Sequence, residues 1–176
     1  MRRRGILVSL LLASIAVGGP AAAASPLVLA GHSVGGVAFG SPLRTAVARL
    51  DRTLGARGRV APTPDLANCG VTATATWGAL HLYFDRGRLV GASAGPGRTP
   101  PVRTDTGLVL GETMAHARAH LGRRLTLRTN QGGAFSVATP HGAEMGFLAP
   151  SNGHPTGASR VLTLDVGVVG CPAMSP

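Results

Sequence analysis

The stretch GVAFGSPLRTAVARL, residues 36–50, aligns without a gap to GLVLGETMAHARAHL, residues 107–121. The matched positions carry the same small or apolar residue: Gly36 with Gly107, Gly40 with Gly111, Ala46 with Ala117, Ala48 with Ala119 and Leu50 with Leu121. Self-similarity at a fixed offset is the signature of a duplicated structural unit. The alignment therefore predicts an internal repeat in which each copy leads into a helix.

Helical spacing follows in both copies. In the first, Ser41 is expected as the N-cap, Pro42 as the first helical residue and Gly55 as the stop. Apolar residues then recur on one face, at Leu43, Ala46, Val47, Leu50 and Leu54. The second copy repeats this stripe at Met114, Ala117 and Leu121 and stops at Gly122.

Strand patterns follow each helix. WGALHLYFDRGRLVGA, residues 77–92, predicts a hairpin that turns at Asp85-Arg86-Gly87. GAFSVAT, AEMGFLA and RVLTLDVGV predict further short strands in the second half. Because the strands come in runs, the fold class is predicted as α+β, with two tandem helix-plus-antiparallel-sheet repeats after a signal peptide. The expected division is a signal peptide over residues 1–24, a first repeat over 25–92, a Pro/Gly linker over 93–104 and a second repeat over 105–176.

The N-terminus has the order of a secretory signal: three arginines, a short apolar segment and a small-residue exit. Cleavage is expected after Ala24. The apolar segment is shorter than the roughly 20 residues of a membrane-spanning helix, and no second one follows, so a secreted protein without a membrane span is predicted. In an oxidising compartment, Cys69 and Cys171 are expected to form a disulfide.

The formal net charge is +10, and every basic residue is arginine. The arginines are scattered, and no aromatic-plus-basic platform accompanies them. A nucleic-acid partner is therefore not expected.

Two catalytic signatures occur at matching points of the repeat. Gly31-His32-Ser33-Val34-Gly35 has the G-x-S-x-G pattern of a serine hydrolase, and Asp105-Thr106-Gly107 that of an aspartic protease. Too few residues precede Ser33 to build the strands and oxyanion loop of a nucleophile elbow, and no second D-[ST]-G motif supplies a partner carboxylate. We interpret both as one shared loop, and a small serine hydrolase using Ser33 stays the alternative function.

Polar residues also line up on the second helix. Glu112, His116 and His120 are spaced four apart, a spacing that can chelate zinc. The line lies opposite the apolar stripe, so an exposed polar face is expected, with neither a metal nor a cofactor.

A binding face is predicted on the hairpin. Strand alternation over residues 76–84 would place Trp77, His81 and Tyr83 together, opposite the core. Aromatic residues with polar tips are typical interface anchors. We expect these three, with neighbouring Arg86 and Arg88, to contact an extracellular protein or a cell-envelope polymer. The predicted function is that of a secreted, non-catalytic binding or inhibitor-like protein.

VGGVAFGSPLRTAVARLDRTLG, the Cys69 region, WGALHLYFDRGRLVG, TGLVLGETMAHARAHLG and LDVGVVGC together resemble a group of uncharacterised secreted actinobacterial proteins. The repeated glycine, helix, Leu-Gly and strand unit is more distantly similar to the β-lactamase-inhibitor-like fold and to small outer-membrane-assembly lipoproteins. The resemblance covers nearly all of the mature chain. It implies tandem helix-plus-sheet units with one sheet face free to bind.

Overall fold

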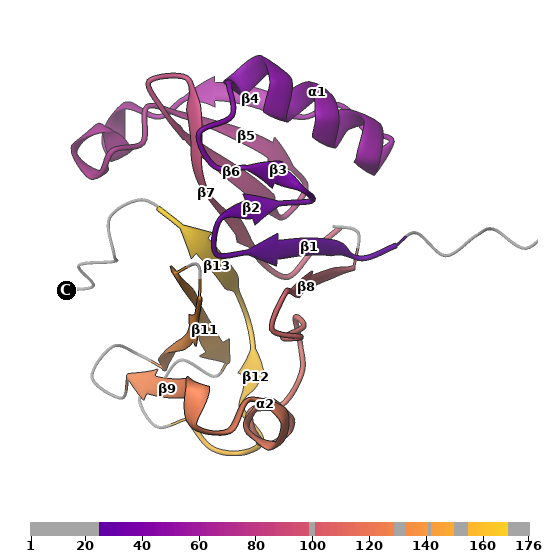
Figure 1. Ribbon diagram of the computed structural model, residues 1–176, viewed down its shortest axis with the longest axis vertical. Coiled ribbons are helices and arrows are strands. Elements are labelled where there is room, and N and C mark those ends of the chain that lie inside the picture. Colours follow the sequence, from indigo (N-terminus) through magenta and orange to yellow (C-terminus); the bar gives the residue numbers. More distant parts are fainter. Residues whose placement is uncertain (1–24, 99–100, 129–132, 141, 150–154, 169–176) are drawn as a thin grey trace, which may run out of the picture.

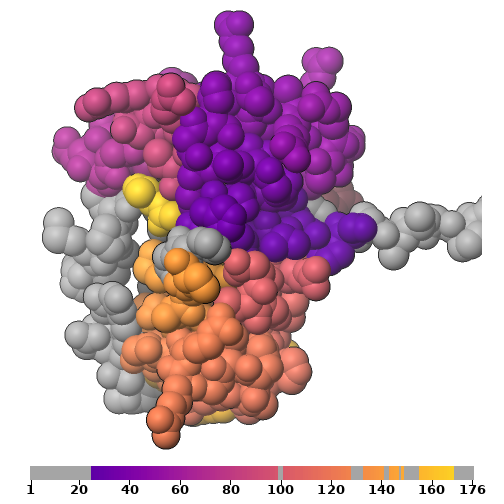
Figure 2. Space-filling model, viewed as in Figure 1, coloured from indigo at the N-terminus to yellow at the C-terminus, as the bar shows by residue number. Residues whose placement is uncertain are grey.

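A computed structural model describes residues 25–98, 101–128, 133–140, 142–149 and 155–168. The predicted signal peptide and Cys171 lie outside these ranges. The described chain is mixed α+β, mostly antiparallel sheet with few helices (Figure 1). In the space-filling view the first half of the chain forms the upper part and the second half the lower part (Figure 2).

The larger sheet contains nine strands, all paired antiparallel. Its order is β4 (Arg59–Pro62), β5 (Ala73–Trp77), β6 (Leu80–Asp85), β7 (Arg88–Ala94), β13 (Leu164–Gly167), β11 (Gly142–Ala149), β10 (Ala134–Thr139) and β9 (Leu125–Arg128), with β12 (Arg160–Val161) paired to β11. The order follows the sequence up to β7 and runs backwards from β13. The two halves of the chain therefore meet through their last strands.

A smaller sheet lies in front of the larger one in Figure 1. Its order is β3 (Val37–Ala38), β2 (Ser33–Val34), β1 (Leu27–Ala30) and β8 (Val102–Thr104). β1 and β8 pair in parallel, with Leu29 opposite Thr104. This pairing joins the N-terminal strand to the start of the second half. The segment expected as a linker over 93–104 is shorter than predicted, because β7 extends to Ala94 and β8 begins at Val102.

The helices are α1 (Leu43–Leu54), α2 (Met114–Leu121) and the 3₁₀ turns η1 (Pro64–Cys69) and η2 (Gly122–Arg124). Both α-helices bury the apolar stripes that the sequence predicted, with Ala46 and Leu50 on α1 matching Ala117 and Leu121 on α2. These side chains join one continuous core with one face of the larger sheet. Gly55 ends α1 in the left-handed conformation, as expected.

The prediction that Ser41 caps α1 is wrong. Pro42 occupies the N-cap position, and no side chain caps the helix. Ser41 is held in backbone pairing instead, because its carbonyl accepts from Leu89 N–H at 2.9 Å.

The two helix starts are docked on strands by the same hydrogen bonds. In the first half, Gly40 N–H donates to the Leu89 carbonyl at 2.7 Å, and the Arg88 guanidinium donates to the Gly40 carbonyl at 2.9 Å. In the second half, Gly111 N–H donates to the Val161 carbonyl at 2.8 Å, and Arg160 donates to the Gly111 carbonyl at 2.7 Å. Gly40 and Gly111 both have a positive φ, of 86° and 80°.

The join between the halves is the pairing of β7 with β13. Ser93 lies opposite Asp165, and Gly91 lies opposite Gly167. A Cβ on Gly91 would overlap the carbonyl of Val168, so the close approach at this end of the join requires glycine. Among the described residues, no helix has the length and apolarity needed to cross a membrane.

Candidate functional site

The five residues predicted to form one binding face lie in three places. The prediction that Trp77 lies on the face opposite the core is wrong. Its side chain is only 6% exposed and belongs to the core beside α1. Its indole N–H donates to Asp51 Oδ1 at 2.9 Å and to the Ala56 carbonyl at 3.2 Å. Trp77 therefore fixes α1 on the sheet and is not on the face that carries His81 and Tyr83.

The reason is a two-residue turn. The sequence pattern treated residues 76–84 as one strand, but Gly78 and Ala79 reverse the chain between β5 and β6. Gly78 has a φ of 60°, which glycine adopts without strain. Trp77 then pairs across the hairpin with Leu80, and paired residues share a face of the sheet. The turn thus resets the alternation and sends Trp77 to the core.

A continuous row of side chains crosses the other face of the sheet. Each member is the cross-strand partner of the next, and the row runs Arg59, Thr76, His81, Ser93, Asp165, Met145, Ser136 and Thr126. We call this the open-face row. Arg59 and Thr126 at its two ends are exposed, Asp165 near its middle is buried, and the other five members are half-buried. Eight strands at about 4.8 Å spacing make the row about 34 Å long.

Polar contacts concentrate at the middle of the open-face row. Asp165 is 6% exposed and accepts from the Thr163 hydroxyl at 3.3 Å. Thr76 Oγ1 and His81 Nδ1 lie 3.3 Å apart. Tyr83 lies two residues along β6 from His81 on the same face and is half-buried. The centre of the face is thus a hydroxyl-rich patch around one buried carboxylate.

The protonation states follow from burial. Burial raises the pKa of Asp165, while hydrogen bonds from Ser93 and Thr163 oppose the rise. Burial and then the charge of Asp165 raise the pKa of Tyr83, against a smaller effect of its hydrogen bond with Ser93. Burial lowers the pKa of His81. Near neutral pH the face therefore offers a phenol donor and an uncharged imidazole.

Arg86 and Arg88 lie at a different place. They line an open hollow of about 530 Å³ together with Phe39, Gly40, Asp85, Leu89, Val90 and Val168. Because Arg88 donates to the Gly40 carbonyl, it holds the start of α1 in place. Arg86 is exposed at the hairpin turn and has a positive φ of 46°.

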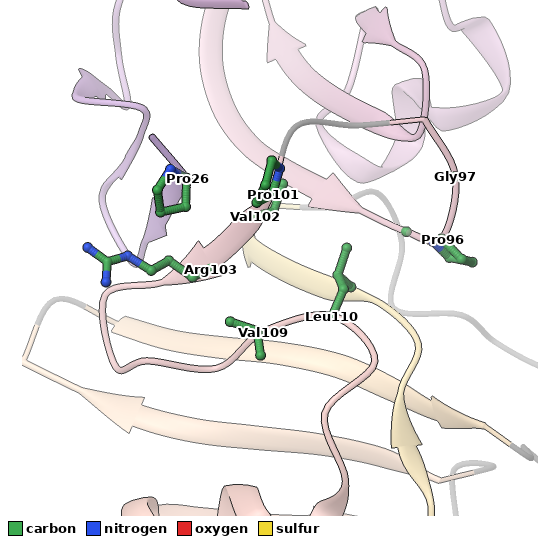
Figure 3. A pocket seen from close by; sticks show the side chains of 9 residues that line it. Pro26, Pro96, Gly97, Pro101, Val102, Arg103, Val109 and Leu110 are labelled. Atoms are coloured by element: carbon green, nitrogen blue, oxygen red, sulfur yellow. The ribbon is translucent and has the colours of Figure 1, made fainter. Parts of the chain in front are cut away.

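A second hollow, of about 340 Å³, lies where β1 and β8 begin (Figure 3). Its wall is mostly apolar and consists of Pro26, Gly95, Pro96, Gly97, Pro101, Val102, Arg103, Val109 and Leu110. Arg103 is the one charged residue among them. No sequence motif marked this hollow.

The most perturbed acid in the described chain is Glu144 on β11. It is 0% exposed and lies in the cross-strand row that faces the core, between Val137 and Val166. The Thr106 hydroxyl donates to its Oε2. Burial first, then a hydrogen bond with the Asp105 carboxyl, raises the pKa of Glu144 to about 7. Glu144 is therefore still partly protonated near neutral pH.

Glu144 lies beside the Asp105-Thr106-Gly107 motif. The sequence offered no partner carboxylate, because no second motif of that kind exists. The carboxyl that lies close to the motif is that of Glu144, which comes from a strand 39 residues later and carries no motif. The only signal was a charged residue at an apolar-facing position of the AEMGFLA strand.

Ser33 lies in β2 and pairs with Ala30 and Ala38 on the neighbouring strands. A second short strand, β3, follows it, and α1 begins only at Leu43. A nucleophile elbow requires a strand, the serine and then a helix in direct succession. The described residues around Ser33 thus form a hairpin.

Cys69 ends η1, and the disulfide to Cys171 stays a prediction because Cys171 lies outside the described residues.

Comparisons with known proteins give a fold and no activity. No family model matches the chain, and no curated protein matches it. Among solved structures, the chain is similar to the crystal structure of the uncharacterized protein yfeY from Escherichia coli, with a TM-score of 0.50 and 13% sequence identity. The match covers 79% of this chain and 98% of that one. The likeness is one of fold alone.

Proposed function

We propose that this chain is a secreted, non-catalytic binding protein whose contact surface is the sheet face that carries the open-face row. The observation behind the proposal is that eight strands contribute one side chain each to this row, and that all of these side chains except that of Asp165 are exposed or half-buried. A sheet that uses only one face for its core leaves the other available to solvent or to a partner.

The size of the face supports the proposal. A row of about 34 Å, with strands about five residues or 17 Å long, gives an area of about 600 Å². A specific protein interface buries about 800 Å² on each partner. The face alone thus approaches the area that a stable contact needs, and the surrounding loops can supply the rest.

The chemistry of the face supports recognition through hydrogen bonds around an aromatic anchor. Tyr83 presents a rigid ring with a protonated hydroxyl, and such side chains lose little conformational entropy on binding. Met145 on the other half adds an adaptable apolar contact in the same row. The ligand class is an extracellular protein or a cell-envelope polymer.

A two-copy architecture is part of this proposal. It is supported by the matching hydrogen bonds at Gly40 and Gly111, the matching guanidinium contacts of Arg88 and Arg160, and the reversal of strand order at the join. In this arrangement each half supplies four main strands of one binding face. The ligand would contact both halves, with Ser93 and Asp165 at the centre.

The experiment is affinity capture with mature protein immobilised through its C-terminus, from culture medium and separately from wall fragments. His81→Ala/Tyr83→Ala and Ser136→Ala/Met145→Ala should each reduce what the wild type captures at least tenfold. Arg44→Ala/Arg52→Ala, two exposed arginines on α1, is the matched control and should retain capture. The proposal fails if both face variants capture as the wild type does.

The hydrolase alternative is tested in parallel with a fluorophosphonate probe. Labelling of the wild type that disappears in Ser33→Ala would overturn the non-catalytic assignment, whatever the capture experiment gives.

A further inference from the structure

Three polar side chains are brought together on one side of α2. Glu112 precedes the helix, and His116 and His120 follow at successive turns. One potential ligand atom from each residue, a ring nitrogen of each histidine and a carboxylate oxygen of Glu112, lies within 4.8 Å of the other two. The two imidazole rings have their centroids 5.2 Å apart, and both side chains are exposed. α2 lies at the bottom of Figure 1.

Hydrogen bonds fix which nitrogen of each ring carries the proton. His116 Nδ1 lies 2.8 Å from Glu112 Oε2, and a carboxylate can only accept. His120 Nδ1 lies 2.9 Å from the His116 carbonyl oxygen, which also can only accept. Both Nδ1 atoms therefore donate. In a neutral imidazole the other nitrogen, Nε2, then holds a free lone pair.

The carboxylate that orients His116 is itself held in place. Glu112 Oε1 accepts from Val109 N–H at 2.8 Å, and only 5% of the Glu112 side chain is exposed, against 72% for His116. A buried, fixed carboxylate that accepts from the Nδ1–H of an exposed histidine is the arrangement found behind metal-ligating histidines. It sets the tautomer and increases the basicity of the ligating nitrogen.

Space is available at the second histidine. A Cβ on Gly107 would lie 3.9 Å from His120 Nε2, so the backbone of the loop before α2 approaches this nitrogen without a side chain. His120 itself is exposed, so solvent also reaches this ring.

We propose that α2 carries a binding site for a divalent transition metal of the zinc, copper or nickel class, with Nε2 of His116 and Nε2 of His120 as ligands and Glu112 as the orienting carboxylate. Imidazole nitrogen suits these ions, and they bind it more tightly than magnesium or calcium, which take oxygen ligands. The protein supplies two ligands, and water or a donor from a partner completes the coordination. The sequence alone predicted only an exposed polar face here.

The test uses the untagged mature protein and the metal ions alone. Zn²⁺ and Cu²⁺ are titrated against a chromophoric chelator, and a stoichiometry of one ion per chain is expected. His116→Ala and His120→Ala should each weaken binding at least tenfold. Glu112→Gln should weaken metal binding about 10- to 100-fold. Glutamine keeps an oxygen that can accept from His116 Nδ1–H, but it carries no negative charge. His32→Ala and His81→Ala are the matched controls and should bind as the wild type does.

A spectroscopic readout on the wild type makes the result independent of how the variants fold. Substoichiometric Cu²⁺ should broaden the side-chain resonances of His116 and His120 before those of His32 and His81. Wild type that does not compete with the chelator, or variants at both helix histidines that bind unchanged, would overturn the site. Selective broadening at His32 or His81 would overturn it as well.

Discussion

Replacing Glu144 by glutamine should make the protein more stable at alkaline pH while changing little at acidic pH. Glu144 is fully buried, faces the core, and has a pKa raised to about 7 from 4.5. In the unfolded chain the Glu144 carboxyl loses its proton near pH 4.5, and in the folded chain it does so near pH 7. Between them the folded state binds more protons, so the free energy of unfolding falls as the pH rises.

The size of the effect follows from the two pKa values. One pKa unit corresponds to about 1.4 kcal/mol, so the difference amounts to about 3 kcal/mol. The stabilisation is fully present below the unfolded pKa, is lost as the pH approaches the folded one, and stays lost above it. Glutamine resembles the protonated acid in shape and cannot ionise.

The assay is urea unfolding at half-unit pH intervals from 4 to 8, followed by circular dichroism. The midpoint of wild type should decrease between pH 4.5 and 7 relative to that of Glu144→Gln, with the urea dependence unchanged. Asp65→Asn, at an exposed carboxyl, is the control and should follow the wild type. A Glu144→Gln curve parallel to wild type over the whole range would refute the assignment.

Three further outcomes follow from packing. Trp77→Phe should cost about 1–3 kcal/mol in urea unfolding, because it removes the indole donor of two hydrogen bonds at a buried site. Gly91→Ala should destabilise the protein strongly and Gly95→Ala hardly at all, since an added Cβ overlaps a backbone carbonyl at the first position and meets nothing within 4 Å at the second; equal thermal midpoints for the two would contradict the pairing of β7 with β13. Leu50→Ala should cost about 2–5 kcal/mol, measured in the same way, because the side chain is fully buried under α1.

The two α-helices and the strands β6, β7, β10, β11 and β13 could be predicted because their signals are local. The apolar stripe from Ala46 to Leu50 and its counterpart on α2 are periodic, and the turn at Arg86-Gly87 separates two apolar runs. Local patterns fail where a short turn changes their phase. Gly78-Ala79 is one of several Gly-Ala pairs in this glycine-rich chain, so the sequence did not mark it as a turn. Without that turn, strand alternation predicted the wrong face for Trp77.

The candidate sites depend on contacts between residues that are far apart in the sequence. The periodic pattern of apolar residues within one segment cannot predict such contacts. The open-face row joins Ser93 to Asp165, and the acid pair joins Asp105 to Glu144. The first requires knowledge that β13 lies next to β7, and the second that the loop after β8 reaches β11. By contrast, Glu112, His116 and His120 were visible as a line, because helical spacing alone brings them together. What the sequence could not supply was the set of hydrogen bonds that orients the two rings.

The join between β7 and β13 has a consequence for any shortened chain. A fragment that ended after Ala94 would leave the backbone donors and acceptors of residues 91–94 without the partners that β13 provides. An unpaired strand edge of this kind can pair with a strand of another chain. In a solution of fragments, β7 of a second fragment presents the same unpaired edge. Two fragments paired in this way would rebuild an eight-stranded sheet around a two-fold axis between the two β7 strands. A first half expressed alone should therefore elute from a sizing column as a pair.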